Sequence, residues 1–315
     1  FGGWYAAVGG GGAAYSGADG LVQSWQGASD VTLHAYWAGT PGLAFTDVGG
    51  TLSVKAGAFS SGPLVIPEYD HGLRVVSVAE EGFNRNPNIT SVYISEGVTS
   101  IGKLAFQLCS GITQISLPST LDLIDEGAFH SCAGITGKLM IPPSVTSIGN
   151  GAFSACTGLT GTLVLPPNLV LLDHGAFHSC TGLTGELIIP PTVTEVGNGT
   201  FAYCTGFTSL KLSPNTVTLG MSAFLNCTGL KGSLVLPATL TTLGPSVFQG
   251  CTGLTSVFIP IATIFVNTDA FADTSPSLQI RCEASDPSLD PSSPAAGWSV
   301  GWNGGCANIL WNQSP

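Results

Sequence analysis

The sequence predicts a β-rich solenoid, in which short turns stack on one another and share one continuous core. The main observation is a phenylalanine, usually preceded by alanine, that recurs at intervals of 23, 23, 24, 24, 24, 23, 24 and 23 residues. Its nine positions are Phe83, Phe106, Phe129, Phe153, Phe177, Phe201, Phe224, Phe248 and Phe271. A unit of this length cannot bury a core alone, so the units are expected to stack.

Composition argues against two classes of partner. The chain has a net charge of -11 and only eight Lys plus Arg, so no basic stripe is available for a phosphate backbone. Nucleic acid and anionic membrane surfaces are therefore not expected partners. No apolar run approaches the roughly 18 residues of a transmembrane helix, so membrane insertion of this chain is not expected either.

Residues 139–161 show how one unit is built. A short strand over residues 139–141 ends at Pro142, because proline cannot donate to a strand ladder. Val145 and Ile148 then point into the core, and Phe153 adds a large ring beside a small alanine. The alternation of short strands and turns favours an almost entirely β architecture.

The recurring pattern Ile/Leu-Pro-x-x-Val/Leu-x-x-Ile/Leu-Gly-x-x-Ala-Phe-x-x-Cys-x-x-Leu resembles the BspA-like leucine-rich repeat (LRR) family. Copies occupy residues 117–135, 141–159, 165–183 and 189–207. The resemblance implies a right-handed, curved array of about nine regular repeats of 23–24 residues over residues 39–282, with an atypical first repeat. It also implies a bacterial secreted or surface protein involved in adhesion and protein–protein contact, without catalytic residues.

The two ends of the chain depart from the repeat. Residues 1–38 contain Phe-Gly-Gly-Trp-Tyr and Asp-Val-Thr-Leu-His-Ala-Tyr-Trp, and resemble the second half of a Listeria–Bacteroides (internalin-type B) repeat. This implies a partial β-grasp-like piece; the alternative is a poorly ordered tail. The first residues do not resemble a signal peptide, so we expect a piece of a longer protein.

Residues 283–315 are interpreted as a C-terminal cap. They begin with a loop rich in Ser and Pro and continue with Trp298, Trp302 and Trp311. Large aromatic side chains after the last repeat suit a segment that covers the open end of the core. Cys282 and Cys306 flank the loop, and in an exported protein they are expected to form a disulfide. The alternative is two thiols buried apart.

Seven cysteines share one repeat position, three residues after the phenylalanine: Cys109, Cys132, Cys156, Cys180, Cys204, Cys227 and Cys251. We predict a ladder of buried, reduced thiols that bond to neighbouring backbone groups. Disulfides between adjacent turns are the alternative, although parallel side chains point badly for them. A ladder also diverges along the axis, so no metal is expected there.

No arrangement of residues predicts catalysis or a cofactor. His130 and His178 follow the phenylalanine in units two apart, which places their backbones about 10 Å from each other, too far to share a metal. No nucleophile elbow is present. We therefore expect a protein that is not an enzyme.

Alternation along the strands predicts a binding surface instead. The outward positions form pairs, and the second member of the pair is apolar in six of eight repeats: Tyr93, Met140, Val164, Ile188, Val235 and Phe258. An exposed apolar stripe often marks an interaction site. The alternative is that β-branched residues simply suit strands.

Two functions follow from these observations. The first is an extracellular or cell-surface adhesin-type module, monomeric, that binds a protein or glycan on a host or neighbouring cell. The second is a rigid spacer that displays another domain of a larger surface protein.

Overall fold

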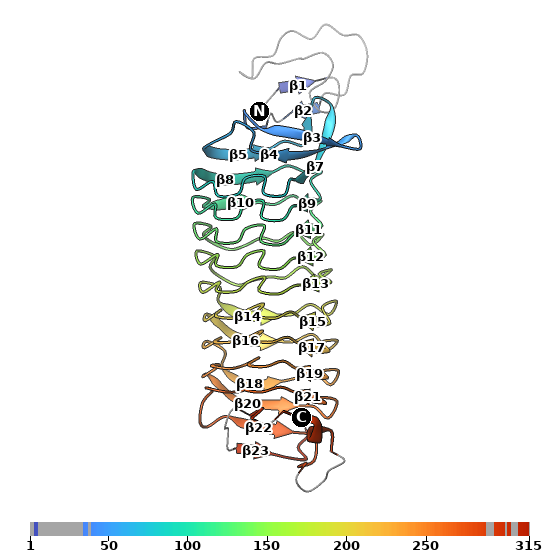
Figure 1. The fold of residues 1–315 in the computed structure, drawn as a ribbon, viewed down its shortest axis with the longest axis vertical. Helices are drawn as coiled ribbons and strands as arrows, with labels where there is room; N and C mark the ends of the chain where they lie inside the picture. Colours follow the sequence, from blue (N-terminus) through green and yellow to red (C-terminus); the bar gives the residue numbers. More distant parts are fainter. Residues whose placement is uncertain are drawn as a thin grey trace.

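The computed structural model describes residues 3–5, 34–36, 39–287, 293–299, 301–303 and 308–314. The chain forms a column of about ten stacked turns spaced by about 23 residues, drawn upright in Figure 1. The described residues contain almost no helix, apart from the short 3₁₀ helix η2 (Pro294–Gly297). The predicted β-solenoid is confirmed, while its right-handedness and curvature stay predictions.

Within residues 1–38 the structure describes one antiparallel pair, β1 (Gly3–Tyr5) with β2 (His34–Tyr36). The remaining residues of the predicted β-grasp-like piece lie outside the described part of the chain. The first solenoid turn begins with the hairpin of β3 (Ala44–Val48) and β4 (Thr51–Lys55). This antiparallel hairpin differs from the parallel pairing of the regular turns, as expected for a terminal unit.

Most turns contribute a strand to one side of the column, which we call sheet A, although its strands pair in separate groups. The strands of sheet A are β5 (Gly62–Ile66), β8 (Ile89–Ile94), β10 (Gln114–Ser116), β14 (Gly185–Ile188), β16 (Phe207–Lys211), β18 (Gly232–Val235), β20 (Leu254–Ile259), β22 (Gln279–Cys282) and β23 (Asn308–Leu310). Neighbours within each group are parallel.

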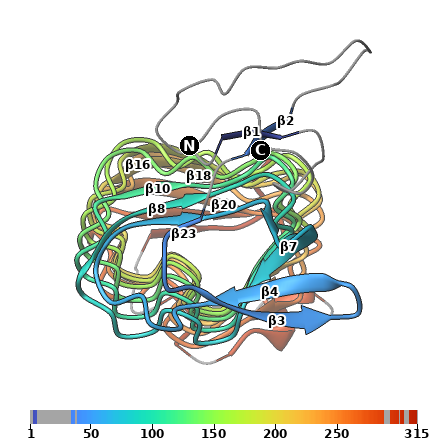
Figure 2. The ribbon, with the colours of Figure 1, turned by 90° about the horizontal axis from the view of Figure 1, so that it is seen from above.

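A second set of short strands, which we call sheet B, lies on another side of the column, as Figure 2 shows from above, and pairs in two groups that meet between β13 and β15. After β3 and β4 its strands are β7 (Leu73–Val78), β9 (Ser100–Ile101), β11 (Leu123–Ile124), β12 (Ser147–Ile148), β13 (Leu171–Leu172), β15 (Glu195–Val196), β17 (Thr218–Leu219), β19 (Thr242–Leu243) and β21 (Phe265–Val266). The short β6 (Tyr69–Asp70) pairs with β7.

The recurring phenylalanines form one stack through the core. All nine are at most 1% exposed, and neighbouring rings lie 5.2–5.8 Å apart with interplanar angles of 5–13°. Stacked aromatic pairs add about 0.5–1.5 kcal/mol beyond the area that they bury. Phe59 closes the stack edge-on at one end, and Trp302 closes it edge-on at Phe271.

The backbone that carries these rings forms a continuous ladder. From Phe83 to Phe248, the amide of each recurring phenylalanine donates to a carbonyl in the next turn, for example Phe106 to Ala128 at 2.7 Å. The ladder runs without interruption from Phe83 to Ala270. We call the segment from each recurring phenylalanine to the residue three positions later, for example residues 153–156, the phenylalanine turn. It is the most regular contact between units.

The seven repeat cysteines add a second link between turns. Each is a buried free thiol whose Sγ donates to the carbonyl of the phenylalanine in the preceding turn, at 3.0–3.2 Å. The same carbonyl also accepts a hydrogen bond from the backbone amide of the cysteine in its own turn, as the Phe106 carbonyl does from Cys109. A small side chain with a weak donor fits this position, and this accounts for the recurrence of cysteine.

Burial raises the pKa of these thiols. The pKa of Cys109 rises to about 11 and that of Cys180 to about 12. Cys282 is also buried, with its pKa raised to about 12, whereas Cys306 lies outside the described residues. The predicted bridge between Cys282 and Cys306 therefore stays a prediction.

Four glycines account for the difference between 23- and 24-residue intervals. Each longer interval contains an additional glycine near the start of its sheet A segment: Gly137, Gly161, Gly185 and Gly232. All four have φ between 76° and 82°, a conformation that other residues rarely adopt. Sheet A loses its strand pairing just before each one, between β10 and β14 and again between β16 and β18.

Residues 138–141 and 162–165, which follow Gly137 and Gly161, form no strand. Isolated bridges from Gly137 to Leu159 and from Gly161 to Leu183 replace the ladder there. An extra residue with positive φ shifts the chain that follows out of register with its neighbour, as in a β-bulge. Where the next turn lacks the glycine, pairing resumes with a register shift, as between β14 and β16.

A different glycine, two residues after each cysteine, allows the turns to approach one another. A Cβ built on Gly158 would lie 2.5 Å from the carbonyl oxygens of Ala133 and Ile135 in the preceding turn. A Cβ on Gly161 would meet nothing within 4 Å, and only its φ of 77° requires glycine. The two columns of glycine therefore have different causes, close packing and conformation.

We expect Gly158→Ala to destabilise the column more than Gly161→Ala. The Gly161 substitution should cost about 1 kcal/mol for the left-handed conformation, whereas the Gly158 substitution has no such conformational cost but forces two turns apart. Urea unfolding of both variants at neutral pH measures the difference. An equal loss, or a larger loss for Gly161→Ala, would contradict this assignment.

The raised thiol pKa values predict that stability falls in alkaline solution. In the unfolded chain a thiol ionises near pH 8.5, well before the folded thiols, so its contribution is present below that pH and decreases above it. Each thiol should remove about 1.4 kcal/mol of unfolding free energy per pH unit between about pH 9 and its folded pKa. Urea unfolding under reducing conditions at several pH values tests this.

The variant Cys180→Ala separates the thiol effect from the titration of lysine and tyrosine. Its unfolding free energy should fall less steeply with pH than that of the original chain, by the contribution of one thiol. Identical slopes would show that the Cys180 thiol ionises equally in both states.

Candidate functional site

Strand register aligns the predicted outward residues within each paired group of sheet A, while Met140 and Val164 lie in turns that form no strand there. Tyr93 of β8 pairs with Ser116 of β10, and Ile188 of β14 pairs with Lys211 of β16. Val235 of β18 pairs with Phe258 of β20. Because parallel partners point to the same face, equivalent side chains lie side by side from turn to turn.

Five of the six predicted apolar side chains are about half exposed or more. The exposed fractions are 50% for Tyr93, 69% for Met140, 55% for Val164, 49% for Ile188 and 58% for Val235. We call these five residues the apolar row. Met140, Val164 and Ile188 occupy three successive turns, so the row is continuous at its centre.

The prediction that Phe258 faces solvent is wrong. Phe258 has the expected register, but it is only 4% exposed. Its partner in the next strand, Arg281, donates to the carbonyl of Ser314 at 3.0 Å. The end of the chain therefore lies over this part of sheet A, and the cap removes Phe258 from the exposed surface.

A groove lies at the centre of the apolar row, between two of its neighbouring residues. It has a volume of about 330 Å³ and lies between residues 162–165 and β14, where the pairing of sheet A is lost. Val164 and Ile188 line it together with Pro167, Pro190 and Pro191. Proline side chains and missing strand pairing make this an apolar depression with a rigid wall.

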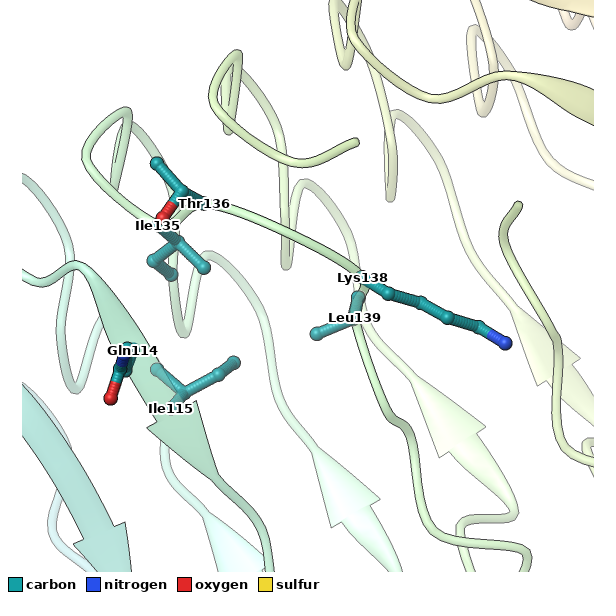
Figure 3. A pocket seen from close by; sticks show the side chains of 6 residues that line it. All are labelled: Gln114, Ile115, Ile135, Thr136, Lys138 and Leu139. Atoms are coloured by element: carbon teal, nitrogen blue, oxygen red, sulfur yellow. The ribbon is translucent and has the colours of Figure 1, made fainter. Parts of the chain in front are cut away.

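A second, smaller groove lies at an earlier break. Its volume is about 230 Å³, and it separates β10 from residues 135–139. Figure 3 shows Ile115 and Leu139 pointing toward one another across it, while Lys138 extends away. Each groove therefore lies where a glycine insertion separates neighbouring turns of sheet A.

Sheet B also exposes apolar side chains, but they do not form a continuous row. Val170 is 65% exposed and Phe265 is 54% exposed, four turns apart. The register neighbours of Leu171 and Phe265 are Ser147 and Thr242. Polar residues therefore separate the apolar ones, in contrast to the centre of the apolar row.

The histidines are bound within the turns. His130 Nδ1 lies 3.0 Å from Ser131 Oγ, and His178 Nδ1 lies 2.9 Å from Ser179 Oγ. Burial, and to a smaller extent His130, lowers the pKa of His178, whose ring packs edge-on against Tyr203 at 5.4 Å. These contacts tie both rings to their own turns.

The described residues offer neither a metal site nor a helix that could span a membrane. Among the residues that the structure describes, no group of three or more His, Cys, Asp or Glu side chains could hold a metal. In the same part of the chain, no helix has the length and apolar character needed to cross a bilayer.

Sequence reasoning identified the row but missed the grooves. The signal was present in the extra glycine of each 24-residue interval, which coincides with a break in sheet A. The proline wall was visible as the repeated Pro-Pro pair, interpreted only as a strand end. Neither feature indicates a groove until the backbone conformation of the glycine is known.

Comparison with known proteins identifies the repeat. The BspA type leucine rich repeat region matches in six copies, over residues 76–185 and 160–279. Residues 1–38 lie outside these matches, and nothing found supports the internalin-type B resemblance. No curated protein matches the chain in sequence.

Solved structures of leucine-rich repeat proteins are among those similar to this chain. A leucine-rich repeat protein from Bacteroides ovatus is 20% identical, with 82% of this chain and 80% of that chain covered and a TM-score of 0.56. A leucine rich repeat protein of T. pallidum is 25% identical, covering 67% and 88%, with a TM-score of 0.49.

A leucine rich cell surface protein from Faecalibacterium prausnitzii is 21% identical, covering 89% and 96%, with a TM-score of 0.43. At these identities the likeness to the Bacteroides ovatus protein concerns the fold alone, and the two lower scores support no conclusion. The repeat match itself spans well over half of the residues. The chain therefore belongs to the BspA-type leucine-rich repeat family.

Proposed function

We propose that this chain is a non-enzymatic, adhesin-type binding module, located outside the cell or on its surface, that binds its ligand with sheet A. The observation that carries the proposal is the apolar row, five half-exposed side chains on one face of a rigid column. Exposed apolar rows on proteins often mark interaction sites. Membership of a family of repeat scaffolds supports the same conclusion.

The dimensions of the row suit an extended ligand. Tyr93 and Val235 are six turns apart, which corresponds to about 29 Å at the spacing of strands. This length accommodates about nine residues of an extended chain. The groove between Val164 and Ile188 lies near the middle of this span, where it can accept one apolar side chain.

A protein ligand fits this surface better than a glycan. Four of the five residues in the row are aliphatic or Met, and Tyr93 is its one aromatic ring. Sugar rings are commonly held against flat aromatic faces, whereas aliphatic side chains and a proline-lined groove suit the side chains of a polypeptide. The chain is proposed to act as a monomer that contacts a protein on a host or neighbouring cell.

A rigid spacer is the second candidate. The unbroken ladder of phenylalanine turns favours it, because a column bonded at every turn holds its two ends apart. A spacer needs no ligand of its own and would show no saturable binding by any face. The two candidates therefore differ in a measurable property.

We expect the double variant Met140→Asp with Ile188→Asp to fold normally and to lose binding. Both side chains are exposed, so their replacement should not disturb the core, whereas two carboxylates on the row cannot be buried against an apolar partner. Saturable binding of the purified chain to a panel of extracellular-matrix proteins, mucins and host cells provides the measurement.

The matched control is Val170→Asp with Val217→Asp on sheet B, two turns apart like the first pair and exposed by 65% and 39%. Binding should survive in the control. Equal loss in both variants would exclude the apolar row as the contact, and no saturable binding by the folded original chain would favour the spacer.

A further inference from the structure

Charge is distributed unevenly over the column. The whole chain has eight Lys plus Arg and nineteen Asp plus Glu. The strands of sheet A, together with residues 138–141 and 162–165, reverse this ratio. They contain Lys138, Lys211 and Arg281 but only one acidic residue, Glu186. The face that carries the apolar row is therefore basic on a strongly acidic protein.

The two lysines of this face are available to a ligand. Both are exposed, and within the described residues neither forms an ion pair. Elsewhere on the column some basic side chains already form ion pairs. The Nζ of Lys103, for example, lies 2.8 Å from a carboxylate oxygen of Glu126. Arg281 is already bound to the carbonyl of Ser314.

The lysines flank the groove of the apolar row. Lys138 lies in the same turn as Met140, which is the turn before Val164. Lys211 lies in the turn after Ile188 and is its register partner. Three turns separate the two lysines, or about 14 Å along the column at the spacing of strands, and Lys211 lies two positions further along its strand than Lys138. The groove between Val164 and Ile188, whose mainly apolar lining also includes Glu186, lies between them.

We propose that the segment bound by sheet A is an extended, acidic stretch of a partner protein; this inference rests on the proposed function. Its carboxylates face Lys138 and Lys211, and an aliphatic side chain between them enters the groove. Residues i and i+4 of an extended chain lie on one face about 13 Å apart, with i+2 between them. The favoured pattern is therefore acidic-x-aliphatic-x-acidic.

The acidic remainder of the column does not prevent this contact. At physiological ionic strength charges are screened beyond about 8 Å, so a bound carboxylate responds mainly to the lysines that it touches. A hydrogen bond between a ligand carboxylate and a lysine ammonium is also stronger than one between neutral groups. The acidic residues on the other faces repel an acidic partner that approaches those faces. The partner is therefore directed toward sheet A.

The experiment selects phage-displayed random dodecapeptides on the immobilised full 315-residue chain. Enriched peptides should contain Asp or Glu with the predicted spacing around Leu, Ile or Val. The affinity of one such peptide is then measured by fluorescence polarisation. We expect Lys138→Glu and Lys211→Glu each to weaken it by about tenfold or more, as for paired charges at interfaces.

The control is Lys55→Glu, which makes the same change of net charge at the end of β4 in sheet B. It should leave the affinity within about twofold. A version of the peptide with Asn in place of Asp should bind weakly to the original chain and lose little further affinity in the two lysine variants.

Three outcomes would overturn the inference. Enriched peptides without acidic bias, whose binding is lost in Met140→Asp with Ile188→Asp, would leave the proposed function intact and remove the acidic partner. Binding of heparin that depends on both lysines, without any enriched peptide, would replace the protein partner by a sulfated glycan. No binding of either probe by the folded chain would count against the inference and the proposed function together.

Discussion

The phenylalanine turn is the contact on which the rest of the column depends. At this segment every unit makes the same three links to its neighbour: a stacked ring, an amide-to-carbonyl bond, and in seven units a thiol donated to the preceding phenylalanine carbonyl. The links run from Phe83 to Phe271 without a gap. Because stability in a repeat array is a sum over neighbouring units, this column of contacts determines whether the turns remain stacked.

This continuity allows sheet A to be irregular. Four inserted glycines interrupt its strand pairing, yet the phenylalanine turns on either side of each break remain bonded. The interruptions open grooves beside exposed apolar side chains and leave the surface with a shape that a regular ladder would not have. One part of each turn thus maintains the stack, while another part is free to vary in shape and charge.

The repeat and its core were predictable because a strict period requires equivalent residues to have equivalent environments. The phenylalanine stack, the short strands and the burial of Cys109 and its counterparts follow from that rule. Phe258 is an exception because the end of the chain lies over its part of sheet A. A terminal segment does not repeat, so the repeat pattern cannot predict what it covers. The internalin-type resemblance likewise depended on a non-repeated segment.

The candidate site was predictable only in outline. Alternation along a strand identified Met140, Val164 and Ile188 as outward residues, since side-chain direction has a period of two. The groove beside them depends on the φ of Gly161 and Gly185, which the residue type permits but does not determine. The basic character of the face depends on which turns Lys138 and Lys211 occupy, and it emerges only after strands are placed in register.

Residue-resolved hydrogen–deuterium exchange of the folded chain tests this division of roles most directly. We expect strong protection of the amides of Phe129, Phe153 and Phe177, and fast exchange over residues 138–141 and 162–165, where sheet A pairing is lost. Equal protection of the two sets would mean that sheet A is continuous in solution. In that case the glycine insertions would not shape the binding face, and the central claim would be wrong.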